Sequence, residues 1–203
     1  MRIAASKALA GVSLAQLPPS ARAALERGFV EVEQSFAVSA SRAETHVERS
    51  AFELARGDLS RAEASLQTAL RLEPCLAEAH LNLADLERQR GREAAAEQAI
   101  RAALKCSPQN AAAHHALGLW QVRAHHTDAA LASLKQAVAL APVDARFSYV
   151  LGVALAQAGH RADAIQVLEA TLKHRPNDAN VRQVLGRLLE QAAQHPRRLF
   201  VDL

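Results

Sequence analysis

The stretch AAAHHALGLWQVRAHHTDAALASLKQAVALAPVD, residues 111–144, holds the pattern that decides the fold. Its apolar and small residues recur at spacings of three, four and seven, which is typical of helices, and a break at His125 divides the stretch in two. The stretch closes on one of four prolines spaced 34 residues apart, namely Pro74, Pro108, Pro142 and Pro176. A chain that repeats at this interval builds a stack in which each unit buries its apolar face on its neighbours.

The neighbouring units align with this stretch without a gap. Each first segment carries a small residue at the same place: Ser50, Ala84, Gly118 and Gly152, with Gly186 beginning a fifth unit. Each second segment carries a small residue followed four positions later by a large one: Ala62 and Leu66, Ala96 and Ile100, Ala130 and Leu134, Ala164 and Leu168. The break falls at Gly57, Gly91 and Gly159, because glycine takes the left-handed conformation that ends a helix without steric cost. The pattern predicts an all-α fold of helical hairpins, with His125 in the same conformation.

With these residues in register, the chain resembles the tetratricopeptide repeat family, whose repeat is a 34-residue helical hairpin. The resemblance implies a right-handed superhelical α-solenoid. It covers four full units and the first helix of a fifth, at residues 43–76, 77–110, 111–144, 145–178 and 179–194, so that the array occupies 43–194.

The N-terminal part divides at Pro18-Pro19. Residues 1–19 are interpreted as a flexible leader, and the alternative is a secretory signal peptide that Lys7 interrupts. Residues 20–42 are predicted to contain a helix that Ser20 caps and that ends near Ala37. Its apolar stripe consists of Leu25, Phe29, Val32 and Phe36. We expect this helix to cap the stack.

The C-terminal end of the array is incomplete, because no second helix follows residues 179–194 in the pattern. A tail, residues 195–203, follows instead. A repeat array needs its terminal apolar face covered. The face carrying Leu185, Leu188 and Leu189 is therefore expected to meet the folded-back tail, another subunit or a downstream domain.

Histidines and cysteines are the candidates for metal or redox chemistry. His46, His80 and His114 lie one repeat apart, which places them roughly 10 Å from each other in stacked hairpins, so they cannot share one zinc ion. Core packing is the preferred interpretation, and no metal or cofactor is predicted. Cys106 is expected to be a small buried apolar residue and Cys75 an exposed turn residue, without a disulfide between them. Their low number suits a reducing compartment, so a cytoplasmic protein is expected.

Composition narrows the class of function. The formal net charge is +3, the charges alternate in sign along the helices, and no basic block suggests a nucleic-acid partner. No catalytic motif occurs, and no run of apolar residues is long enough for a membrane span. We expect a non-catalytic scaffold of bacterial type rather than an enzyme.

The family resemblance further implies a concave groove, lined by first helices, that binds a partner protein or peptide. The residues carried over to it are Asn82, Asp85, Arg88, Gln89, His115, Leu119, Val122, Arg123, Tyr149, Val153, Gln157 and Arg187. A peptide with an apolar middle and opposite charges at its two ends would complement them. Two alternatives stay open: a targeting module of a larger transferase or oxygenase, and an assembly factor that forms a homodimer through the uncapped last helix.

Overall fold

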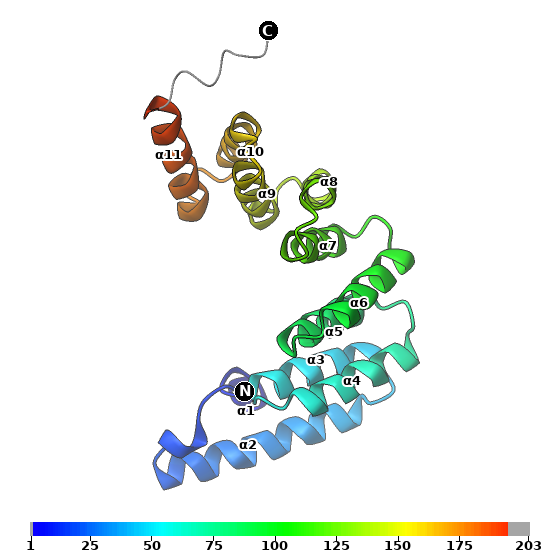
Figure 1. Ribbon diagram of the computed structural model, residues 1–203. Helices are drawn as coiled ribbons and strands as arrows, with labels where there is room; N and C mark the ends of the chain where they lie inside the picture. Colours follow the sequence, from blue (N-terminus) through cyan, green and yellow to red (C-terminus); the bar gives the residue numbers. More distant parts are fainter. Residues whose placement is uncertain (1, 195–203) are drawn as a thin grey trace. The chain divides into compact units, whose positions relative to one another are not determined.

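Helical hairpins make up the computed structural model, which describes residues 2–194 (Figure 1). The chain divides into two compact units between Pro108 and Gln109. The first unit contains α1 (Arg2–Ala8), a 3-10 turn η1 (Leu14–Gln16), α2 (Pro19–Val38), α3 (Ala43–Ala55), α4 (Leu59–Leu72), α5 (Ala77–Gln89) and α6 (Glu93–Cys106). The second unit contains α7 (Ala111–Arg123), α8 (Thr127–Leu140), α9 (Ala145–Gln157), α10 (Arg161–His174) and α11 (Ala179–Gln194).

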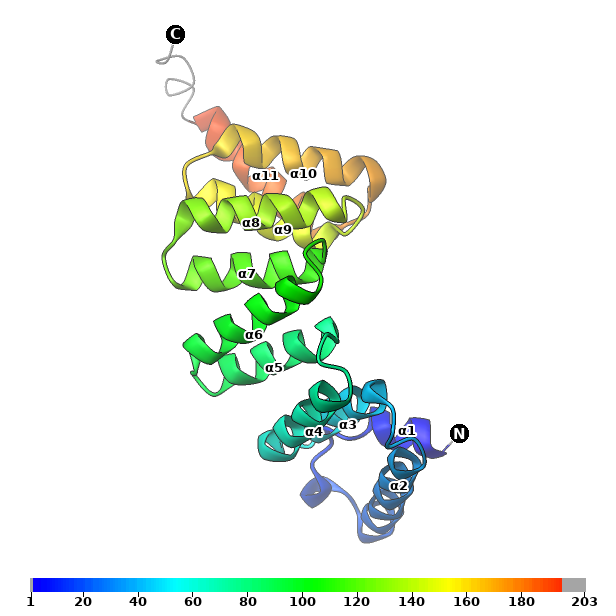
Figure 2. The same ribbon diagram turned by 90° about the vertical axis from the view of Figure 1, so that its right-hand side faces the viewer.

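Successive helices pair as the repeat predicts. In the first unit α3 pairs with α4 and α5 with α6, and in the second unit α7 pairs with α8 and α9 with α10. Figure 2 shows α7 and α8 side by side. No strand occurs in residues 2–194, so the predicted all-α class is confirmed.

The turn inside each hairpin has the same hydrogen-bonded geometry. Gly57, Gly91 and Gly159 have φ of +80°, +72° and +88°, and His125 has φ of +58°. One residue further on, a backbone N–H donates back to a carbonyl in the last turn of the first helix; in the third hairpin the His126 N–H donates to the Gln121 carbonyl at 2.9 Å. This is the Schellman arrangement that favours glycine. The predicted left-handed break is confirmed at all four positions.

Replacing His125 by glycine is expected to raise the free energy of unfolding by about 1 kcal/mol, because only a residue with a Cβ atom is strained in this conformation. Thermal unfolding followed by circular dichroism measures the change. Gly159→Ala is the reverse substitution at the equivalent turn, and it is expected to lower the free energy of unfolding. An added Cβ would meet no described atom within 4 Å, so only backbone strain can cause the loss. A lower melting temperature for His125→Gly would contradict the assignment.

The second helix of each hairpin ends shortly before the proline of its repeat. The last helical residues are Leu72, Cys106, Leu140 and His174, and each lies two positions before its proline. The intervening residues have φ between −132° and −139° and positive ψ, as expected before proline.

The core of each hairpin is a large aliphatic side chain set against a small residue. Leu134 and Leu168 are fully buried. A Cβ atom added to Gly118 would lie 2.6 Å from Leu134 Cγ, and one added to Gly152 would lie 2.7 Å from Leu168 Cδ2. Helices α7 and α9 therefore approach α8 and α10 at distances that only glycine permits.

One buried position of the first helix is occupied by a different type of residue in different hairpins. In α3 it is Glu53, which accepts a hydrogen bond from Ser65 Oγ at 2.7 Å. In α7 it is Gln121, which accepts from Ser133 Oγ at 2.7 Å. In α5 it is Glu87, which pairs with Arg92 of the same hairpin. In α9 it is Leu155, so the last complete hairpin has an apolar residue at this position.

The N-terminal segment differs from the expected flexible leader. Residues 2–8 form α1, which packs on α2. The buried Ser6 side chain lies against Gly28, and an added Cβ there would be 2.1 Å from Ser6 Oγ. Lys7 pairs with Glu48 at 3.0 Å and lies 4.6 Å from the centroid of the Phe36 ring. These contacts are not periodic, so the repeat pattern could not reveal them.

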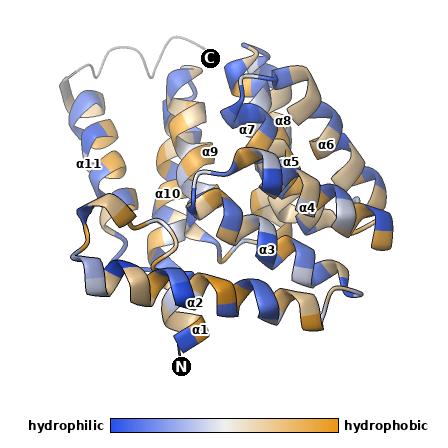
Figure 3. Cartoon of the chain, turned by 90° about the horizontal axis from the view of Figure 1, so that it is seen from below, coloured by the Kyte–Doolittle hydropathy of each residue, from blue (hydrophilic) through white to orange (hydrophobic). Residues whose placement is uncertain are grey.

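Helix α2 buries the predicted stripe. Hydrophobic and hydrophilic segments alternate along this helix in Figure 3. The helix begins at Pro19, which occupies the first helical position, and it ends at Val38. Ser20 lies inside the helix and does not cap it, which corrects the expected start. Proline suits this place because its missing N–H would have no partner in the first turn.

Candidate binding face on the first helices

The predicted groove residues of the first unit lie on α5. Asp85, Arg88 and Gln89 are exposed, and Asn82 is half-buried. Arg88 Nε lies 3.6 Å from Asp85 Oδ1, so these two charges pair along the helix surface. The face offers polar groups with little net charge.

In the second unit, α7 contributes four predicted residues. The His115 ring lies 4.7 Å from the Phe147 ring of α9, centroid to centroid, which joins the two first helices. Leu119 is half-buried, Val122 is 37% exposed, and Arg123 is exposed with Nη1 donating to the Leu119 carbonyl.

Helices α9 and α11 provide the remaining predicted residues. Gln157 and Arg187 are exposed, whereas Tyr149 and Val153 are half-buried. Tyr149 packs against the hydrophobic core of the second unit, so its side chain supports the fold as well as facing the surface.

A hollow of about 290 Å³ lies among α7, α8 and α9. It brings together two of the predicted residues, Val122 and Gln157. The other lining residues are His125, Thr127, Ala130, Leu131, Ala154 and Ala158. Valine, leucine and alanine form most of the wall, and His125, Thr127 and Gln157 supply polar groups. Such a mostly apolar concavity with a few polar groups is typical of a site that binds an apolar side chain.

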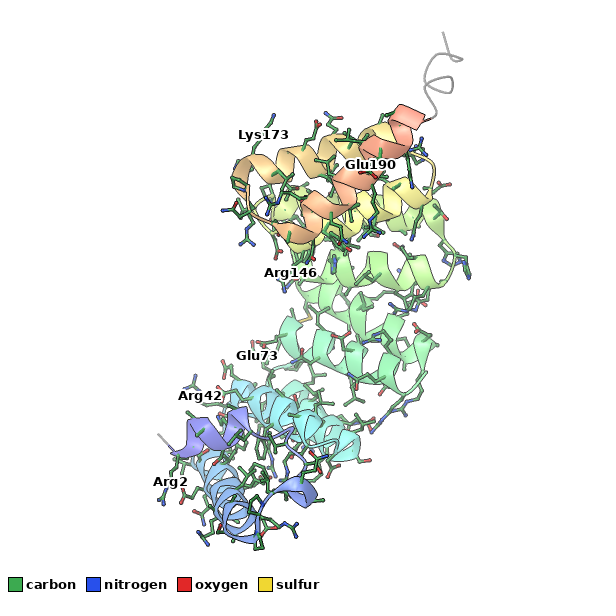
Figure 4. All side chains as sticks on the ribbon, turned by 90° about the vertical axis from the view of Figure 1, so that its left-hand side faces the viewer. Arg2, Arg42, Glu73, Arg146, Lys173 and Glu190 are labelled. Carbon is green, nitrogen blue, oxygen red and sulfur yellow. A yellow bond between two sulfur atoms is a disulfide. The ribbon has the colours of Figure 1, made fainter. Side chains whose placement is uncertain are left out.

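Arg146, labelled in Figure 4, is partly neutralised by Asp144. Its Nη2 lies 2.7 Å from Asp144 Oδ2, and its backbone N–H donates to the same carboxylate. The hydrogen bond from the Arg146 side chain is the main cause that lowers the pKa of Asp144, which also caps α9. Within the second unit, Arg123 and Arg187 are the exposed cations of the predicted set.

Two of the three histidines that lie one repeat apart, His46 and His80, contact backbone carbonyl groups. His46 is buried, and its Nε2 lies 2.8 Å from the Ala40 carbonyl oxygen. His80 repeats this contact at 2.9 Å with the Pro74 carbonyl oxygen. Each ring thus joins its helix to the turn that precedes it. No group of three or more His, Cys, Asp or Glu side chains in residues 2–194 is arranged to hold a metal ion.

The cysteines overturn the sequence-based expectation. Cys75 and Cys106 form a disulfide, with Cα atoms 5.2 Å apart. Cys75 is exposed as expected, but Cys106 is only half-buried. The bridge lies near Glu73 in Figure 4 and ties the turn before α5 to the end of α6. Because disulfides persist mainly in oxidising compartments, the cysteines no longer support a reducing one.

A further hollow, of about 450 Å³, was not predicted. It lies in the first unit beside α2, where Leu14, Phe29 and Arg56 contribute to its wall. The Arg56 guanidinium lies 4.8 Å from the Phe29 ring centroid and 5.4 Å from that of Phe52. The sequence carried no signal for it, because these contacts join the capping helix to a repeat.

Two family models match the chain, at residues 53–111 and 121–197, and both describe the tetratricopeptide repeat. Together they cover more than half of the sequence. The chain belongs to the tetratricopeptide repeat family. Neither model describes a catalytic domain. None of the curated proteins compared with this chain is similar enough in sequence to count as a relative.

Several solved structures share the fold. TTC0263 of Thermus thermophilus, a thermophilic protein of the family, is 21% identical with a TM-score of 0.67, and the match covers 93% of this chain and 99% of that one. PilF of Pseudomonas aeruginosa is 24% identical with a TM-score of 0.68, covering 76% and 70%. YrrB, described as having an unusual peptide-binding site, is 21% identical with a TM-score of 0.61, covering 82% and 84%.

Tetratricopeptide repeat domains generally mediate interactions between proteins. No helix within residues 2–194 combines the length and the apolar character that crossing a membrane requires.

Proposed function

We propose that this tetratricopeptide repeat protein is a non-catalytic scaffold that binds a peptide segment of a partner protein on the first-helix face of its second unit. The hollow between α7 and α9 carries the proposal, because it combines an apolar wall with residues that the family resemblance assigns to ligand binding. The peptide-binding site described for YrrB, a protein of the same fold, is consistent with this use.

The hollow indicates what the peptide would present. At about 290 Å³ it is near the lower limit of ligand pockets, which suits one large apolar side chain better than a whole small molecule. Gln157 and Thr127 at the wall can hydrogen-bond to the peptide backbone beside that side chain. The exposed cations Arg123 and Arg187 favour acidic residues in the flanking segments.

Val122→Glu is expected to weaken peptide binding by about tenfold or more, because a carboxylate would have to be buried against the incoming apolar side chain. Peptides selected from a displayed library on the whole protein, then measured by isothermal titration calorimetry, provide the ligand. Val122 is partly exposed, so the variant is expected to keep its helicity and melting temperature.

Val143→Glu is the matched control. Val143 is a more exposed valine of the same unit, in the turn between α8 and α9, and it does not line the hollow. Equal losses of affinity in both variants would place the peptide elsewhere. Arg123→Glu tests the charge argument separately, since it should weaken acidic peptides and leave neutral ones unchanged.

A further inference from the structure

Helix α11 is built like the first helix of a hairpin, but within residues 2–194 no second helix pairs with it. Leu189 occupies the position that is buried in every complete hairpin. Its equivalents are 2% exposed at Glu53, 5% at Glu87, 9% at Gln121 and 1% at Leu155, whereas Leu189 is 45% exposed. The position that normally faces a second helix is therefore open.

Gly186 marks the same opening independently. In the two preceding hairpins, Gly118 packs against Leu134 and Gly152 packs against Leu168. A Cβ atom added to either glycine would overlap the leucine side chain. At Gly186 an added Cβ meets no atom of residues 2–194 within 4 Å. Glycine inside a helix is unfavourable compared with alanine. Gly186 therefore lowers the stability of α11. In α7 and α9 the close packing of a leucine against the glycine offsets this loss.

The neighbouring side of α11 is already used. Val181, Leu185 and Leu188 are buried in the core of the second unit. The open side is a separate stripe at spacings of four, three and four residues along the helix: Arg182, Gly186, Leu189 and Ala193. Residues at these spacings lie on one side of a helix.

This stripe is complementary to itself. When two copies of α11 run antiparallel about a two-fold axis between positions 187 and 188, Gly186 faces Leu189 of the second copy, and Leu189 faces its Gly186. Arg182 and Ala193 oppose each other in the same way. A two-fold interface needs this reciprocal match, in which residue i meets j and j meets i. The glycine–leucine contact would repeat, between copies, the one at Gly118 and Leu134.

We propose that α11 is a self-association surface, and that a second copy of this chain covers it with Leu189 of each copy seated beside Gly186 of the other. The proposal does not rest on the peptide hollow, which is lined by α7, α8, α9 and the turns beside them. The two proposals share only helix α11, which carries the flanking cation Arg187. A single helix pair is a small interface, so the dimer is expected to be weak and to depend on concentration.

The test is a set of reciprocal substitutions measured on the whole chain by sedimentation velocity from about 1 μM to about 1 mM. Gly186→Leu would oppose leucine to leucine, and Leu189→Gly would oppose glycine to glycine. Each is expected to raise the dimer dissociation constant by about tenfold or more. The double substitution Gly186→Leu with Leu189→Gly restores one leucine per glycine, and it is expected to recover most of the lost affinity.

Folding of the variants can be checked separately. The added Cβ of Gly186→Leu meets no atom of its own chain in the described part, so helicity and melting of the monomer should be maintained. A chain that stays monomeric over the whole range would overturn the proposal, whether the stripe is covered by the tail or by another protein. A dimer that Gly186→Leu leaves intact would overturn it as well.

Discussion

Reducing the Cys75–Cys106 disulfide is expected to lower the free energy of unfolding by about 3 to 4 kcal/mol, on the chain-entropy estimate for a closed loop of this length. The bridge joins residues 31 positions apart and closes the α5–α6 hairpin at its open end. Without it, the unfolded hairpin gains conformations that the cross-link forbids. Guanidinium denaturation with and without a phosphine reductant, followed by circular dichroism, measures the difference.

The double variant Cys75→Ser with Cys106→Ser should behave like the reduced protein and should not respond to the reductant. Thiol titration of the unreduced chain should find no reactive cysteine. The single tryptophan, Trp120, lies in the second unit, so its fluorescence follows that unit while circular dichroism follows all helices. An unchanged midpoint after reduction would show that the bridge adds nothing to stability.

Truncating Glu53 to alanine is expected to cost about 2 to 4 kcal/mol, from the cavity and from the Ser65 hydroxyl left without its acceptor. Arg49 and Arg61 also contact Glu53, but both pair with Glu33 and are partly exposed, so they lose less. Urea denaturation with an unchanged slope measures the effect on stability.

The repeat itself supplies the controls for Glu53. Glu53→Gln copies the Gln121–Ser133 pair, keeps an acceptor for the hydroxyl, and should cost about 1 kcal/mol. Glu53→Leu combined with Ser65→Val copies the apolar pair Leu155 and Val167, and it should stay within about 1 kcal/mol of the parent. If the apolar pair proved as damaging as alanine, the buried carboxylate would contribute more than its replaceable contacts.

Local and periodic features of the fold could be predicted from the sequence. The 34-residue register placed the small and large residues of each hairpin, and it placed the left-handed turns because glycine and proline act through their own backbone. The register also predicted that no second helix follows α11, and none does within residues 2–194. These features depend on neighbours in the chain or one repeat away.

Features that depend on contacts outside the repeat could not be predicted. The disulfide joins a turn to the end of the next second helix, a separation three short of the period, so aligning equivalent positions concealed it. The packing of Ser6 on Gly28 involves no repeat position. For the candidate site, the sequence indicated Val122 and Gln157 through family resemblance, but the size of the hollow depends on alanine side chains whose placement only the structure gives.

The buried position that is Glu53, Glu87, Gln121 or Leu155 also bears on errors of assembly. Near-identical hairpins can exchange partners during folding or between chains, which is a characteristic failure of repeat proteins. Here an exchange that set α9 against α4 would place Leu155 opposite Ser65, leaving the hydroxyl without an acceptor. The changing chemistry of one position thus works against domain-swapped products, and a chain with four identical pairs would lack that safeguard.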